Sequence, residues 1–136
     1  MASSYYIGID GGGTKTYGII ADEKGNMLAS ARRDSSNYLQ VGIDKARENM
    51  IGMIKELCQS QSIDMVSVDY IFFGLAGAGR ADDQATISAA LIEGGLREPQ
   101  FSVTADFTTA LASGTFGEPG VIVISGTGSV CFALAA

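Results

Sequence analysis

The stretch IGIDGGGTKT, residues 7–16, determines how the rest of the sequence is interpreted. Apolar residues alternate before Asp10, as is typical of a β-strand, and a second apolar run at residues 16–21 follows the glycines. Residues 22–26 carry a turn signal, and residues 27–33 predict a third strand. Strands joined by such short connections predict an antiparallel three-strand meander at the start of the chain.

The glycine-rich turn itself allows several interpretations. A P-loop needs a Gly-Lys-Ser/Thr step that opens a helix, but Thr14 separates Gly13 from Lys15 and a strand follows. A dinucleotide fingerprint also needs a helix, and Thr16 stands where its last glycine would be. A plain hairpin turn remains open, although it needs only one or two such residues. We expect a phosphate site, because side chains would block close approach and many of the φ angles needed. The predicted phosphate contacts are Gly11, Gly12, Gly13, Thr14 and Lys15.

The middle of the chain alternates helix and strand patterns. Residues 34–42 predict a polar loop, and a helix is expected from Asp44 onward because its apolar residues recur on one face. Those residues are Ala46, Met50, Met53, Ile54, Leu57 and Cys58. A strand is predicted at residues 68–73, and a helix at residues 82–93. The expected buried stripe of that helix is Ile87, Leu91 and Ile92.

The last third predicts a strand at residues 101–104, a short helix at residues 106–113 and a hairpin of residues 121–125 and 130–135. No helix is predicted to cover this hairpin. The order of elements predicts an α/β fold with a mixed sheet and helices, followed by a new hairpin. The segment VISGTGS, residues 123–129, repeats the form of the first glycine segment, which suggests two duplicated lobes that grip a triphosphate from both sides.

A third glycine segment, residues 74–79, lies between a predicted strand and a predicted helix. It is therefore a rival dinucleotide site, but Asp82 stands at the position of the last glycine and would repel a pyrophosphate. We expect these glycines to allow tight backbone packing or to border a substrate.

Asp106 is the candidate for chemistry, because it follows a strand and begins a helix. An N-cap role, in which its carboxylate accepts a backbone N–H, is one explanation and is worth about 1 kcal/mol. A carboxylate at the carboxyl end of a strand is also where open α/β sheets place functional groups. There it could accept a hydroxyl proton during phosphoryl transfer. The residues alone leave both explanations open.

Composition and charge limit the classes of partner. The 136 residues, 46% of them hydrophobic, predict one globular domain with a real core, and the net charge of −6 argues against nucleic acid. The uncharged stretch 120–136 is broken by glycines and is not expected to span a membrane. The first residues lack the features of a signal peptide. The isolated Cys58 and Cys131 predict reduced thiols in a cytoplasmic protein.

Four segments in register resemble one family: residues 7–16, residues 74–77, Asp106 and residues 125–129. Together they resemble the N-acetylglucosamine kinase-like branch of the BadF/BadG/BcrA/BcrD ATPase family, in the actin–Hsp70–sugar-kinase superfamily. The resemblance covers essentially the whole chain. It implies an actin-like ATPase lobe of ribonuclease H-like fold, with a mixed five-stranded sheet, at residues 1–117. Residues 118–136 would then open a second lobe.

The resemblance also implies the ligands and their positions. ATP and Mg²⁺ are the expected cofactors, with Asp10 expected to bind Mg²⁺ through water. Residues 11–15 would contact phosphates, as would Thr127, Gly128 and Ser129. Asp106 would activate the sugar 6-hydroxyl as the base and contact the sugar. Asn37, by itself only a loop residue, matches a position that hydrogen-bonds sugar hydroxyls in such kinases.

The implied function is ATP-dependent phosphorylation of N-acetylglucosamine or a related amino sugar. Two alternatives are an ATP-driven activator of another enzyme, from the dehydratase-activator branch, and a sensor that binds without catalysis. The positions of Cys58 and Cys131 argue against the cluster-binding activator, and Asp106 argues against the sensor. The resemblance places the adenosine-binding residues and much of the sugar pocket beyond this chain, so we expect the chain alone to be inactive. A homodimer is left open.

Overall fold

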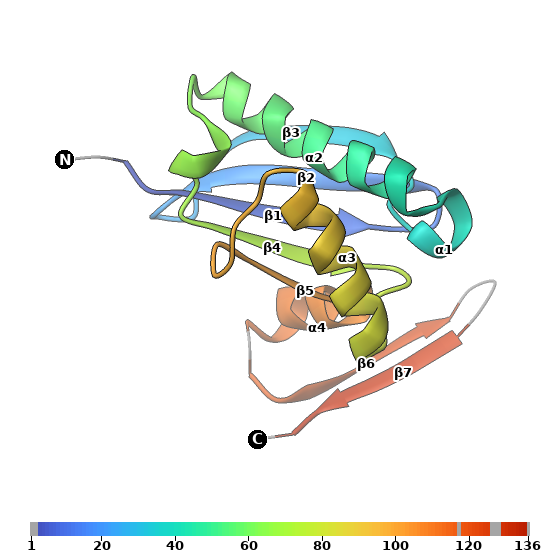
Figure 1. The fold of residues 1–136 in the computed structure, drawn as a ribbon. Helices are drawn as coiled ribbons and strands as arrows, with labels where there is room; N and C mark the ends of the chain where they lie inside the picture. Colours follow the sequence, from blue (N-terminus) through green and yellow to red (C-terminus); the bar gives the residue numbers. More distant parts are fainter. Residues whose placement is uncertain (1–2, 117, 126–128, 136) are drawn as a thin grey trace.

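Five strands form one mixed sheet in the order β3-β2-β1-β4-β5 (Figure 1). The computed structural model describes residues 3–116, 118–125 and 129–135. The strands of this sheet are β1 (Tyr5–Gly11), β2 (Lys15–Asp22), β3 (Met27–Asp34), β4 (Tyr70–Leu75) and β5 (Phe101–Ala105). β1, β2 and β3 pair antiparallel, whereas β1, β4 and β5 run parallel. The predicted meander and the five-stranded mixed sheet are confirmed.

The helices cover both faces of this sheet. α2 (Ile43–Ser60) and α3 (Ala81–Glu93) lie on one face, and α4 (Asp106–Thr115) lies on the other (Figure 1). Two short elements flank α2 in the chain: α1 (Tyr38–Val41) precedes it, and the 3₁₀ turn η1 (Met65–Ser67) follows it. None of the helices in the described part of the chain is long and apolar enough to span a membrane.

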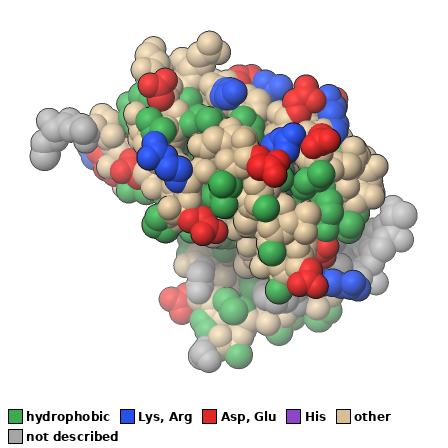
Figure 2. All heavy atoms as spheres, viewed as in Figure 1, with side chains coloured by type: hydrophobic (Ala, Val, Ile, Leu, Met, Phe, Trp, Pro, Cys, Tyr) green, Lys and Arg blue, Asp and Glu red, His purple; other side chains and the backbone are tan. Residues whose placement is uncertain are grey.

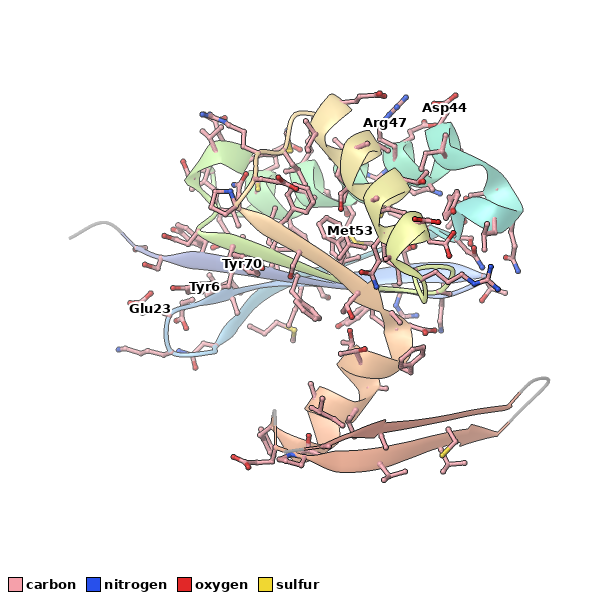
Figure 3. All side chains as sticks on the ribbon, turned by 60° about the horizontal axis from the view of Figure 1, so that its bottom comes forward. Tyr6, Glu23, Asp44, Arg47, Met53 and Tyr70 are labelled. Carbon is pink, nitrogen blue, oxygen red and sulfur yellow. The ribbon has the colours of Figure 1, made fainter. Side chains whose placement is uncertain are left out.

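The core lies between the sheet and α2, whose apolar face was predicted from its periodicity. All six residues predicted for that face are buried, with Met50, Met53 and Ile54 fully so. Met53 lies between α2 and the sheet (Figure 3), and a Cβ on Gly18 would lie only 3.2 Å from Cγ of Met53. The absence of a side chain at Gly18 therefore lets the helix pack closely on β2.

The outer surface of α2 and α3 carries charges of both signs side by side (Figure 2). Arg47 donates to Asp44 on its own helix, at 3.0 Å, and to Glu93 of α3, at 2.8 Å. Figure 3 shows Asp44 and Arg47 on the outer part of α2. Because these pairs are exposed, they link the two helices but add little stability.

Some sequence expectations differ from the structure. The predicted polar loop of residues 34–42 contains α1, capped by Asn37 at its start. β4 runs over Tyr70–Leu75 and not over residues 68–73, because Gly74 and Leu75 still pair with both neighbouring strands. Ile92, expected to be buried, is 46% exposed, and Ala90 takes its place in the interface.

The final strands, β6 (Gly120–Ser125) and β7 (Ser129–Leu134), form the predicted antiparallel hairpin. It lies beside α4, apart from the five-stranded sheet (Figure 1). A Cβ on Gly120 would lie 2.8 Å from Cγ2 of Thr115, so β6 packs closely on α4. α4 contacts the five-stranded sheet on one side and the hairpin on the other. The expectation that no helix covers the hairpin is therefore wrong.

Candidate functional site

The carboxyl ends of the three parallel strands meet at one edge of the sheet. Gly11 of β1 pairs with Leu75 of β4, and Leu75 pairs in turn with Ala105 of β5. Asp10 immediately precedes this row and Asp106 immediately follows it. Open α/β sheets bind ligands at this edge. Both predicted acidic residues thus lie where a ligand site is expected.

Asp10 and Asp106 approach each other on the same face of the sheet. Side chains alternate along a strand, and Ile7 and Ile9 are buried in the core against α2. Asp10 therefore points to the opposite face, which α4 covers. Partial desolvation raises the pKa of Asp10, and the neighbouring carboxylate of Asp106 raises it further. This edge concentrates negative charge that a divalent cation would neutralise.

Asp106 is the first residue of α4, and Ala105 occupies the N-cap position without a side-chain hydrogen bond. Oδ1 of Asp106 accepts the backbone N–H of Phe107 at 2.9 Å. The carboxylate thus has part of the capping role that the sequence left open, although from the first helical position. A negative charge here also interacts favourably with the helix dipole.

Space explains the first glycine of the glycine-rich turn. A Cβ on the buried Gly11 would overlap Oγ of Ser36 and would lie 2.6 Å from Cδ2 of Leu75. Gly11, Gly12 and Gly13 all lie outside the positive-φ region that only glycine adopts readily. The expectation that special φ angles select these glycines is therefore wrong, whereas close packing accounts for Gly11.

The rest of the turn presents hydrogen-bond donors to solvent. The N–H of Gly12 donates to the carbonyl of Lys15 at 2.8 Å and closes the turn. Gly13, Thr14 and Lys15 are exposed, and within the described residues no acceptor pairs with the N–H of Gly13 or Thr14. A Cβ on Gly13 would lie 3.4 Å from the side chain of Gln40 in α1. Adjacent free N–H groups beside a lysine suit a phosphate.

Ser35 connects this turn to the segment that carries Asn37. Its hydroxyl donates to the carbonyl oxygen of Gly12 at 3.2 Å and accepts the N–H of Asn37 at 3.1 Å. The buried amide of Asn49 in α2 donates to the carbonyl of Ser35 at 2.8 Å. Sequence reasoning missed Ser35, because its only signal was its place beside Asn37 in a polar run.

Asn37 is held through its side-chain oxygen. Oδ1 accepts the N–H of Leu39 at 3.2 Å and so caps α1. A Cβ on Gly77, which has φ +85°, would lie 2.5 Å from the same oxygen. Within the described residues nothing pairs with the Nδ2 amide of Asn37. That amide is available to a sugar hydroxyl, and its role in binding stays a prediction.

Tyr38 and Asp83 are a second pair that the sequence did not reveal. The Tyr38 hydroxyl donates to Oδ1 of Asp83, which joins α1 to the first turn of α3. This hydrogen bond raises the pKa of Tyr38. Asp82 and Asp83 make the start of α3 acidic, which disfavours a pyrophosphate there. The packing explanation of the segment 74–79 fits this arrangement.

The second glycine segment is only partly described. Thr127 and Gly128 lie outside the described residues. Ser129 begins β7 and its backbone pairs with Ser125, as expected for a hairpin. The predicted phosphate contacts of this hairpin stay predictions.

The sheet edge that carries Asp10 and Asp106, called the acidic edge below, is where the predicted magnesium ion would bind. Within the described part of the chain no group of three or more acidic or cysteine side chains could hold a metal on its own. Mg²⁺ in phosphoryl-transfer sites usually takes one or two carboxylates, several waters and substrate phosphates. An exposed Asp10 with Asp106 nearby fits that sparse pattern.

Comparisons with known proteins identify relatives that match nearly the whole chain in sequence. The chain is 34% identical to N-acetyl-D-glucosamine kinase from Dictyostelium discoideum, over 96% of its length. It is 32% identical to N-acetylmuramic acid/N-acetylglucosamine kinase from Clostridium acetobutylicum, over 94% of its length. It spans 43% and 42% of these two relatives.

A solved structure gives the same result. The crystal structure of a putative N-acetylglucosamine kinase from Chromobacterium violaceum superimposes with a TM-score of 0.74, at 29% identity, over 97% of this chain and 45% of that one. The fold is that of actin-like sugar kinases, as predicted. The sequence model of one family matches residues 7–135. The chain therefore belongs to the BadF/BadG/BcrA/BcrD ATPase family.

Proposed function

We propose that this chain is the N-terminal part of an ATP-dependent kinase for N-acetylglucosamine or a related amino sugar. The observation that carries the proposal is the placement of Asp10 and Asp106 on one face, beside a turn with free N–H donors. The kinase relatives support it. Residues 1–117 form the first lobe in this proposal, and residues 118–136 begin the second.

Asp106 acts as the general base in this proposal. Its carboxylate accepts the proton of the sugar 6-hydroxyl as that oxygen attacks the γ-phosphorus of ATP, and ADP leaves. The N–H of Phe107 fixes one carboxylate oxygen, which orients the group. General-base assistance of this kind contributes roughly 10²–10⁴-fold in rate.

The glycine turn and Asp10 serve the phosphates. The N–H groups of Gly13 and Thr14 and the ammonium of Lys15 contact phosphate oxygens, and Thr127 to Ser129 contact them from the second hairpin. Asp10 would hold Mg²⁺ through water, and the ion would neutralise charge on the phosphates. This neutralisation would also relieve the repulsion between Asp10 and Asp106, which adds to burial in raising the pKa of Asp10. Asn37 donates to a sugar hydroxyl.

The alternatives find less support in the structure. A cluster-binding activator presents cysteine thiolates at a dimer interface, but Cys58 is buried in the core. A non-catalytic sensor gives no role to Asp106 beside Asp10. Two free thiols and the use of ATP support a cytoplasmic location.

ADP release tests the proposal. The full-length protein that contains this chain is given Mg²⁺-ATP with N-acetylglucosamine, glucosamine, N-acetylmannosamine or glucose, and Asp106→Asn runs beside it. We expect release that depends on one amino sugar and falls roughly 10²–10⁴-fold in the variant. Slow release that is indifferent to every sugar and to Asp106 would instead favour the ATP-driven activator.

A further inference from the structure

Gly74 occupies the middle of the acidic edge. It pairs with Asp10 of β1 on one side and with Thr104 of β5 on the other. Because Gly74 and Asp10 are partners in register, they share one face of the sheet, the face that α4 covers. The backbone of Gly74 therefore lies directly between the two strands that deliver the acidic residues.

α4 rests on this glycine through Thr109. A Cβ on Gly74 would overlap Oγ1 of Thr109 and would lie 2.7 Å from its Cβ, closer than side chains approach in real proteins. Rotation about χ1 can move the hydroxyl away, but the Cβ of Thr109 is fixed to the helix backbone. A side chain at Gly74 therefore forces the helix away from the sheet.

The contact between Thr109 and Gly74 is steric and not polar. Oγ1 of Thr109 is buried and has no hydrogen-bond partner within the described residues, so no polar interaction explains its position. Thr109 lies three residues after Asp106, on the same side of α4. A displacement of the helix at Thr109 is thus transmitted to Asp106.

We infer that Gly74 and Thr109 are positioning residues, which set the height of α4 above the sheet and so place the Asp106 carboxylate beside Asp10. Their part in catalysis rests on the proposed function, whereas their part in geometry does not. Neither residue needs to touch a substrate for this role.

Steady-state kinetics of Gly74→Ala in the full-length protein tests the catalytic part. We expect kcat to fall roughly 10²-fold, because a shift of about 1 Å in a reacting group has that effect. KM for ATP should stay unchanged, because the proposed phosphate donors lie in the turn between β1 and β2, and neither Gly74 nor Thr109 belongs to that turn. A wild-type kcat in this variant would overturn the inference.

Two further variants separate positioning from general damage. Gly8→Ala is the matched control, since a Cβ there would meet Ile19 at an ordinary 3.9 Å on the same face of the sheet; its kcat should remain at the wild-type value. Gly74→Ala/Thr109→Gly removes the opposing side chain and should recover most of kcat. An equal loss in Gly8→Ala, or no recovery in the folded double variant, would contradict the inference. If Gly74→Ala fails to fold, Thr109→Ile can replace it, because it enlarges the contact from the helix side. This variant should lower kcat and leave KM for ATP unchanged.

A readout other than activity keeps the inference independent of the kinase proposal. A crystal structure of Gly74→Ala, determined without ligand beside the wild type, reports the position of α4. The carboxylates of Asp10 and Asp106 should lie further apart in the variant, because the added Cβ meets the Cβ of Thr109. An unchanged separation of the two carboxylates would overturn the inference whatever kcat does. If the wild type phosphorylates no sugar, the kinase proposal fails, while this separation still decides the positioning role.

Discussion

Ser35 donates its hydroxyl to the carbonyl oxygen of Gly12, and this hydrogen bond of 3.2 Å joins the segment before α1 to the glycine-rich turn. The same hydroxyl accepts the N–H of Asn37. The predicted phosphate turn and the predicted sugar-binding residue are therefore held by one buried side chain, and a change at Ser35 should reach both.

Ser35→Ala should destabilise the chain by about 1 kcal/mol, because it leaves the partners of a buried hydroxyl unpaired. In the full-length protein it should also raise KM for both ATP and sugar. Chemical denaturation and steady-state kinetics measure the two effects. The neighbouring Ser36→Ala is the control, since the buried hydroxyl of Ser36 has no partner within the described residues. Its removal should leave stability equal or higher. Equal losses in both variants would contradict the role of Ser35.

Gly11→Ala should lower stability by about 1–3 kcal/mol, because the added methyl group overlaps Ser36 and lies against Leu75. Thermal or denaturant unfolding measures the loss. Gly79→Ala is a suitable comparison, since a Cβ at Gly79 meets nothing within 4 Å and should be tolerated. Similar stability of the two variants would show that the packing around Gly11 yields more easily than the structure indicates.

Asp10→Asn should stabilise the protein at neutral pH. The pKa of Asp10 is raised above its ordinary value of 3.8, so the stability that its protonated form provides is complete below pH 3.8. That contribution is lost as the pH rises through the folded-state pKa. The gain from Asp10→Asn should therefore be present at pH 7 and disappear below pH 3.8. Solvent at the exposed carboxylate keeps the effect small.

The same electrostatic relationship makes a double-mutant cycle informative. Asp106→Asn removes the second cause of the raised Asp10 pKa, so the stabilities of Asp10→Asn and Asp106→Asn should not add at pH 7. Each single change abolishes the same repulsion. Denaturant unfolding of the wild type, both single variants and the double variant gives the coupling. Strict additivity would show that the two carboxylates do not interact.

The 136-residue chain by itself should bind ATP weakly and have no useful kinase activity. The proposed clamp uses two hairpins, and the relatives with kinase names are more than twice as long as this chain. Calorimetric titration with Mg²⁺-ATP and a turnover assay, both run beside the full-length protein, test this. Turnover by the isolated chain that matches the full-length protein would refute the prediction.

Local patterns were sufficient to predict much of the fold. The alternation around Ile7 and Ile9 and the 3.6-residue period of α2 each describe one buried face, and both faces are buried in the structure. α1 was missed because four residues between Asn37 and Gly42 are too few to show a period. The sequence predicts the end of β4 too early, because a glycine is typical of a break in a strand. In the structure Gly74 pairs with β1 on one side and with β5 on the other.

The candidate site was less predictable because its contacts join distant parts of the chain. Asp106 is predicted from its place after a strand, whereas Asp10 is predicted only from the family resemblance, and the structure brings the two together. The bond of Tyr38 to Asp83 and the contact of Thr109 with Gly74 depend on how helices rest on the sheet. A single sequence carries no local signal for such contacts. The phosphate, metal and sugar roles stay predictions.

The row formed by Gly11, Leu75 and Ala105 has a consequence for folding. β1 and β5 are separated by about two thirds of the chain, and they become neighbours of the same strand only when β4 inserts between them. Such non-local pairing forms slowly, because a long loop must close before any contact is gained. We therefore expect the two acidic residues to meet late in folding, so that a partly folded or nascent chain should not hold the assembled acidic pair. Hydrogen exchange should accordingly show β4 protected together with the carboxyl end of β1, as one cooperative unit.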